Sequence, residues 1–150
     1  MLARLKSLLT PDKEPGAARF EKKQLAAAVL LAEAAYLDDG ISEIEHARMI
    51  ALMQRFFGLS ADEAKALVAQ ACAVQGAAVE LSRFTQAVKD AFDAEERIDI
   101  IEMLWEVVYA DGVLHAYEDN LMRRIGGLLY VSDKDRGRAK ARVKRRLGLD

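Results

Sequence analysis

Helix-start signals recur along the whole chain, and they constrain its fold more than any other feature. Ser42, Ser60 and Asp93 are each followed three residues later by a glutamate. In this pattern, called a capping box, both side chains satisfy backbone amides that a first helical turn leaves unpaired. Between these signals apolar residues recur at spacings of three and four, as in Met49 and Met53. Alternating strand patterns are missing, so the sequence predicts an all-α fold.

The same signals divide the chain into elements. The predicted helices cover residues 2–9, 17–37, 43–57, 61–75, 80–92, 94–110, 115–130 and 133–147. Both prolines lie within residues 10–16, where they separate the first helix from the rest. We therefore expect an N-terminal amphipathic helix and linker at residues 1–16. Residues 17–150 form the domain, a compact bundle of about seven to eight helices in all.

An internal repeat relates two parts of this bundle. Shifted by 73 residues, residues 33–49 lie over residues 106–122 without a gap. The matched pairs are Glu33 with Glu106, Tyr36 with Tyr109, Asp38 with Asp111, Glu45 with Glu118 and Met49 with Met122. Only the turn glycine is displaced, Gly40 against Gly112. Two helix–turn–helix units related in this way predict an internal pseudo-two-fold repeat.

Two glutamates stand alone in apolar helices. Glu33 is the only charged residue from position 25 to position 37, and no other charge lies between Glu102 and Asp111 except Glu106. Burying an ionised carboxylate without a partner costs several kcal/mol. Each of these glutamates must therefore be protonated, hydrogen-bonded, ion-paired or metal-bound.

The acidic residues of both copies are candidate metal ligands. They are Glu33, Asp38, Asp39, Glu45, Glu106, Asp111 and Glu118. Carboxylate oxygens suit Ca²⁺, Mg²⁺ or Mn²⁺ better than zinc. The glutamates that follow the turns equally suit helix caps, and those inside apolar helices could instead pair with backbone amides, His46 or His115. The EF-hand calcium loop does not fit, because Val107 and Tyr109 stand where its first two ligands belong.

The repeated turn also carries a family resemblance. In each copy a Glu is followed five residues later by an Asp at a glycine-containing turn, and then by Ile or Leu, Ser or His, two residues and Glu. This pattern resembles the tellurite-resistance TerB-like family over about residues 20–147. The resemblance implies an all-helical inverted repeat, divalent-metal binding by the acidic residues above, and a cytoplasmic or membrane-associated stress role. Similar domains joined to J-domains in co-chaperones imply protein binding. His115 and the displaced Gly40 depart from the family pattern, so the two halves need not bind alike.

Charge is distributed unevenly along the chain. Residues 31–122 hold 18 acids and 6 bases, a charge of −12, whereas residues 133–150 hold 8 bases and 3 acids, a charge of +5. An acidic face predicts a basic protein partner, with a homodimer as one form. The basic tail carries an apolar seam at Ala139 and Val143 and has no aromatic residue to stack on bases. We therefore expect a packed helix whose bases pair with acids of the same chain or of a dimer mate. We expect no nucleic-acid binding.

Other function classes receive less support. The sequence has no P-loop, dinucleotide-binding turn, nucleophile elbow or HExxH motif, so we expect no enzyme. We expect the lone Cys72 to be a core residue. A single cysteine also indicates a reducing, cytoplasmic setting. The longest apolar run, residues 25–37, is shorter than the roughly 20 residues of a membrane span, which allows at most peripheral membrane contact. We expect a divalent-metal-binding helical module of stress response, or alternatively an acidic protein-interaction adaptor without bound metal.

Overall fold

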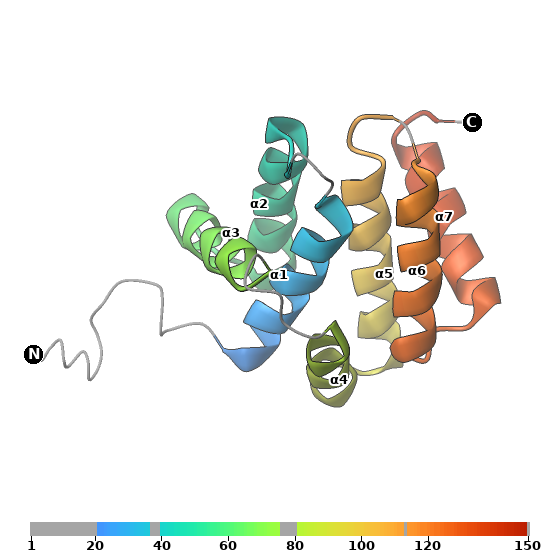
Figure 1. The fold of residues 1–150 in the computed structure, drawn as a ribbon, viewed down its shortest axis with the longest axis horizontal. Coiled ribbons are helices and arrows are strands. Elements are labelled where there is room, and N and C mark those ends of the chain that lie inside the picture. The colour runs from blue at the N-terminus through green and yellow to red at the C-terminus, as the bar shows by residue number, and fades with distance from the viewer. Residues whose placement is uncertain (1–20, 37–39, 76–80, 113, 150) are drawn as a thin grey trace, which may run out of the picture.

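The protein is a bundle of helices. The computed structural model describes residues 21–36, 40–75, 81–112 and 114–149, and within these ranges it holds seven helices and no strand (Figure 1). The helices are α1 (Lys22–Ala35), α2 (Glu43–Phe57), α3 (Ala61–Gln75), α4 (Leu81–Ala91), α5 (Ala94–Val108), α6 (Ala116–Leu128) and α7 (Asp133–Arg146). The predicted all-α bundle is confirmed. The predicted helix at residues 2–9 lies outside the described residues.

The capping signals of the sequence set the helix starts. At α2 the Ser42 Oγ accepts a hydrogen bond from the backbone N–H of Glu45 at 3.1 Å, and Glu45 Oε1 accepts one from the N–H of Ser42 at 3.1 Å. The same reciprocal pair begins α3 at Ser60 and α5 at Asp93. Each such cap stabilises its helix by about 1 kcal/mol. The starts of α2, α3 and α5 coincide with the predicted ones for this reason.

Helix ends are less well predicted than helix starts. Helix α1 covers Lys22–Ala35; residues 17–20 of the predicted helix lie outside the described residues, and α1 ends two residues before the predicted 37. Helices α5 and α6 also stop two residues early. Tyr36 is extended, with φ −73° and ψ 129°, and Tyr109 has left the helix with ψ 12°. In both copies the helix ends before the turn glycine, at the C-cap residues Tyr36 and Tyr109.

Helix α1 is the centre of the molecule. It contacts α2, α3, α4, α5 and α6, and nine of its 14 residues are buried. A helix that is apolar on every face is expected in such a position. Glu33, the one charged residue of the apolar run, is half-buried and therefore lies at the edge of the core.

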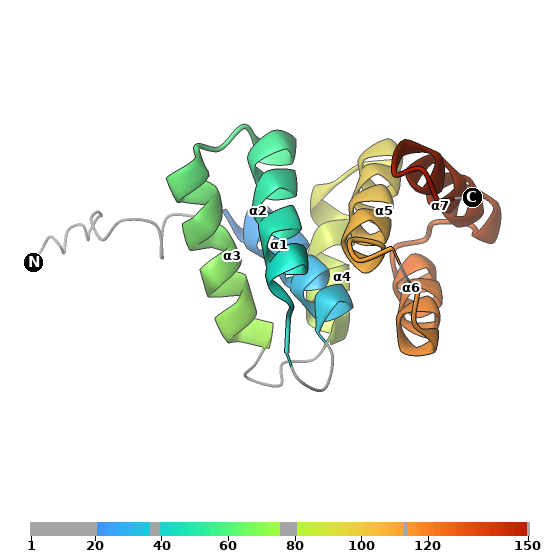
Figure 2. The same ribbon diagram turned by 90° about the horizontal axis from the view of Figure 1, so that it is seen from above.

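The internal repeat extends over three helices. Shifted by 73 residues, α1, α2 and α3 cover residues 95–108, 116–130 and 134–148, within two residues of α5, α6 and α7 at each end. Helix α4 links the halves. Helix α1 packs against its repeat counterpart α5. The contact of α1 with α6 is matched by the equivalent contact of α5 with α2. Figure 2 shows α3 and α7 at opposite ends of the molecule, as an approximate two-fold axis between α1 and α5 requires.

Both repeated turns lie at one end of the bundle. Helices α1 and α5 end, and α2 and α6 begin, at the top of Figure 1. Gly40 has φ +94° and Gly112 has φ +84°, backbone conformations that favour glycine because a Cβ would be strained there. Each copy therefore keeps a glycine although the two glycines differ by one position in the alignment.

Most of the side chains expected in the core are buried, but Cys72 is half-buried. Met49, Met53, Met103 and Met122 are at most 5% exposed, and Trp105 is 1% exposed. Leu128 continues the apolar spacing of Leu121 and Ile125 but is 38% exposed. It is the last residue of α6 and the repeat counterpart of Arg55, which is also exposed. No described helix is both long enough and apolar enough to cross a membrane.

Candidate functional site

Two helix-capping glutamates, Glu45 and Glu118, are buried at the end of the bundle that carries both turns. Together with Asp111 and His115 they form a group that we call the carboxylate end. Glu45 is 4% exposed and Glu118 is 1% exposed. Glu45 Oε1 accepts hydrogen bonds from the N–H and Oγ of Ser42, at 3.1 and 3.0 Å. Glu118 Oε1 accepts one from the N–H of His115 at 3.1 Å. The caps use one oxygen of each carboxylate for these bonds, as the cap alternative predicted.

The second oxygen of Glu118 has no such role. Its Oε2 is buried and has no hydrogen-bond partner among the described residues. Burial raises the pKa of Glu118 to about 7, and the negative charges of Glu45 and Asp111 add to this effect. The hydrogen bond from the His115 amide and the charge of that histidine act in the opposite direction. A proton or a metal cation beside Oε2 would relieve the cost of burying this charge.

The other predicted ligands are not gathered around Glu118 in the described structure. Asp111 is exposed, and its Oδ2 lies 3.7 Å from His115 Nε2. Glu33 lies near enough to Tyr117 that its charge, after burial, helps to raise the pKa of that tyrosine. Asp38 and Asp39 lie outside the described residues. Within the part of the chain that the structure describes, no three histidine, cysteine or acidic side chains are grouped so that they could hold a metal ion.

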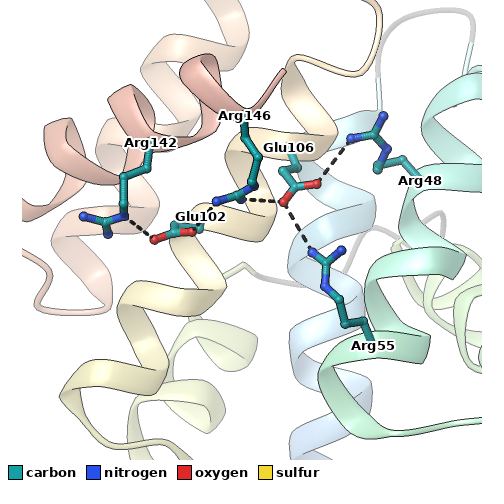
Figure 3. Close-up of polar contacts among 6 residues, drawn as sticks. All are labelled: Arg48, Arg55, Glu102, Glu106, Arg142 and Arg146. Atoms are coloured by element: carbon teal, nitrogen blue, oxygen red, sulfur yellow. Dashed lines mark hydrogen bonds and ion pairs between the residues drawn. The ribbon is translucent and has the colours of Figure 1, made fainter. Parts of the chain in front are cut away.

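Glu106 belongs to a different group, which we call the arginine cluster. The cluster joins three helices (Figure 3): Arg48 and Arg55 of α2, Glu102 and Glu106 of α5, and Arg142 and Arg146 of α7. Its members meet because α2 and α7 both pack against α5.

Three guanidinium groups surround the Glu106 carboxylate, whose side chain is 7% exposed. Oε1 accepts a hydrogen bond from Arg48 at 3.2 Å, and Oε2 accepts bonds from Arg55 at 3.4 Å and Arg146 at 2.6 Å (Figure 3). Of the alternatives for a buried carboxylate, Glu106 is therefore ion-paired, with arginines and not with a histidine. A divalent cation at Glu106 would meet three positive charges, so this environment opposes metal binding there.

The basic C-terminal helix α7 forms ion pairs with acids of the same chain. Arg142 Nε donates to Glu102 Oε2 at 2.6 Å, and Arg146 Nη1 donates to Glu102 Oε1 at 3.3 Å. Lys140 Nζ lies 3.9 Å from Asp119. The hydrogen bond to Glu106 raises the pKa of Arg146. The bases of the C-terminal helix therefore pair with acids of the same chain, which is one of the two alternatives that the sequence left open.

The arginines were not predicted as site residues, although a signal for them exists. Arg48 and Arg55 are seven residues apart, and Arg142 and Arg146 are four apart, so each pair lies on one helix face. The repeat holds a second signal, because every arginine of the cluster has an uncharged counterpart 73 residues away. These counterparts are Leu121, Leu128, Ala69 and Ala73. The repeat thus shows that the positions equivalent to the four arginines of the cluster carry no charge in the other copy.

Comparison with known proteins identifies the family. A family model described as tellurite resistance protein TerB matches residues 24–141, which is most of the chain. The chain belongs to the TerB family. It is a helical module of a family related to tellurite resistance, as the repeated turn suggested. No curated protein and no solved structure matches the chain.

Family membership leaves several expectations as predictions. The TerB match begins and ends inside the proposed domain, residues 17–150, and the division at residue 16 stays a prediction. So do the lack of enzymatic activity, the cytoplasmic location, the protein partner or homodimer, and the lack of nucleic-acid binding.

Proposed function

We propose that this TerB-family module binds a divalent cation, Ca²⁺, Mg²⁺ or Mn²⁺, at the carboxylate end. One observation carries the proposal: the buried Glu118 Oε2 has no hydrogen-bond partner among the described residues and carries a pKa raised to about 7 beside Glu45 and Asp111. A buried polar atom without a partner is rare and calls for an explanation. A bound cation supplies one, because it would neutralise the crowded carboxylates.

The donor chemistry fits hard cations, although the described side chains do not themselves form a group of three that could hold one. The carboxylate end offers carboxylate oxygens from both repeat copies, which is the chemistry that these three cations prefer. A bound cation would act electrostatically, by allowing buried acids of both halves to stay ionised together. Glu45 and Glu118 form the centre of the proposed site, with Asp111, Glu33, Asp38 and Asp39 as further ligands. Glu106 is left out because the arginine cluster holds it.

Calorimetric titration of each cation into metal-free protein tests this proposal. We expect saturable binding to the wild type and its loss in Glu118→Gln, whose amide oxygen still accepts the cap hydrogen bond. Glu63→Gln is the matched control, because Glu63 makes the same cap contact at an exposed site. The double variant Asp38→Asn with Asp111→Asn should also bind more weakly. Absence of heat at millimolar cation, or equal binding by Glu118→Gln, contradicts the proposal.

Protein docking at the same end is a second candidate. Tyr36, Ile44 and Tyr117 are 42%, 57% and 49% exposed, and Ile44 and Tyr117 are repeat counterparts next to the two cap glutamates. Exposed apolar side chains beside acids suit an adaptor that binds a basic, partly apolar protein segment. This candidate expects no cation binding, so the same titration separates the two.

A further inference from the structure

The arginine cluster holds more hydrogen-bond donors than its acids use. Each guanidinium carries five N–H donors. Among the described residues Arg48 and Arg55 each make one hydrogen bond, to Glu106, at 3.2 and 3.4 Å. Arg146 makes two, one to each glutamate of the cluster. Four guanidinium groups face the two carboxylates of Glu102 and Glu106, so the cluster alone carries a charge of +2.

A cleft of about 450 Å³ opens beside this cluster, between α2, α5 and α7. Arg55 and Arg146 line it together with the Glu106 carboxylate, and Phe56 and Met103 add an apolar wall. Asp99 and Glu102 also border the cleft, so its lining holds two arginines and three acids. The cleft therefore combines guanidinium donors, an apolar wall and acidic side chains.

Arg55 is the donor most easily redirected. Its side chain is 67% exposed, and its 3.4 Å contact to Glu106 lies at the long end of hydrogen-bond distances. If Arg55 turned toward a ligand, Glu106 would keep its bonds to Arg48 and Arg146. The buried carboxylate would not lose its charge compensation, so the cost of redirecting Arg55 is small.

The acids of the cleft limit the charge of a ligand. Burial and then the charge of Glu102 raise the pKa of Asp99, which shows that added negative charge is unfavourable at that border. A dianion such as phosphate would be repelled by Asp99, Glu102 and Glu106. A carboxylate with a single charge, placed near the arginines, meets less repulsion and matches the planar guanidinium fork.

We propose that this cleft binds an organic carboxylate, with its anionic group between Arg55 and Arg146 and its apolar part against Phe56 and Met103. The site is independent of the proposed cation site, since it shares no residue with the carboxylate end. A free organic acid and the C-terminal carboxylate of a peptide offer the same chemistry.

Titration of the 150-residue protein with 3-phenylpropionate, followed by ¹H–¹⁵N NMR, tests this inference. We expect saturable shifts at α2, α5 and α7 around the cleft, and none with the neutral amide 3-phenylpropionamide. Inorganic phosphate should bind more weakly than the carboxylate. The peptide Gly-Gly-Phe, with a free and with an amidated C-terminus, identifies the source: tighter binding of the free peptide than of phenylpropionate supports a peptide ligand, and weaker binding supports a free acid.

Arg55→Gln provides the decisive variant. It should weaken carboxylate binding about tenfold, the effect of one charge-assisted hydrogen bond. Arg123→Gln is the matched control, because Arg123 is 64% exposed and also lies 3.4 Å from its acidic partner, Asp119. Equal unfolding temperatures of the two variants exclude a folding effect. Equal binding of acid and amide, shifts remote from the cleft, or unchanged affinity in Arg55→Gln would overturn the inference.

Discussion

Glu118 combines a structural and an electrostatic role in one side chain. One carboxylate oxygen completes the cap of α6, while the other is buried without a hydrogen-bond partner in the described structure. Glu63 makes the same cap at the start of α3 with its side chain in solvent. Comparison of the two glutamates separates the effect of burial from the effect of capping.

This difference gives stability a defined pH dependence. Because the pKa of Glu118 is about 7 in the folded state and 4.5 when unperturbed, folding binds a proton between these values, and stability falls as pH rises from 4.5 to 7. Above pH 7 the ionised group destabilises the fold by about 3 kcal/mol. Without metal, Glu118→Gln should therefore gain about 1–3 kcal/mol relative to wild type at pH 8, and little at pH 4.

Urea denaturation across this pH range measures the effect, with Glu63→Gln as the control. That variant removes an exposed charge, so its stability relative to wild type should change little over the same range. A Glu118→Gln advantage that is constant with pH would show that the carboxyl of Glu118 titrates normally in the folded protein.

At the scale of helices, the arginine cluster joins the two halves of the repeat. Glu106 on α5 is bound by α2 of the first half and by α7 of the second half. Removing one partner from a buried ion pair leaves uncompensated charge and is strongly destabilising. Glu33 stands at the equivalent position of α1 but is only half-buried. The two glutamates are matched in sequence and differ in environment.

Glu106→Gln should lower the free energy of unfolding by about 1–3 kcal/mol, and Glu33→Gln by less than about 1 kcal/mol. The reason is that, of the two, only Glu106 accepts hydrogen bonds from several guanidinium groups, whose side chains are 32–67% exposed. Chemical denaturation of metal-free protein gives both values under one set of conditions. Equal losses in the two variants would mean that the ion pairs of Glu106 contribute little to stability.

The helices show which features of the sequence determine structure locally. The starts of α2, α3 and α5 were predicted to the residue because cap and glutamate interact within one turn. The end of α1 was predicted two residues late because it depends on the path of the following turn. The arginine cluster was missed because its six residues come from three helices, and only their packing brings Arg48 and Arg146 to one carboxylate.

At the scale of the whole molecule, the repeat explains why acids from distant segments meet. The two-fold relation of α1 and α5 brings both turns to one end, and it places Glu45 close enough to Glu118 to affect its pKa. The sequence alignment predicted this relation from 17 positions, and the structure extends it to three helices per half.

The repeat alone did not place every acid correctly. Equal positions predicted equal roles for Glu33 and Glu106, but the arginines of α2 and α7 surround only Glu106. The grouping of Glu118 with Glu45 could be inferred from the pseudo-symmetry, whereas the burial of its second oxygen depends on packing that no local pattern records.

The most direct test of the account is the pKa of Glu118, measured by ¹³C NMR of its side-chain carboxyl with and without saturating Mg²⁺ or Ca²⁺. We expect a midpoint near pH 7 in metal-free protein and a fall of at least about one pH unit with the cation, because a bound cation favours the ionised form. A midpoint near the ordinary value of 4.5, or a raised midpoint that the cations leave unchanged, would contradict a cation site at the carboxylate end.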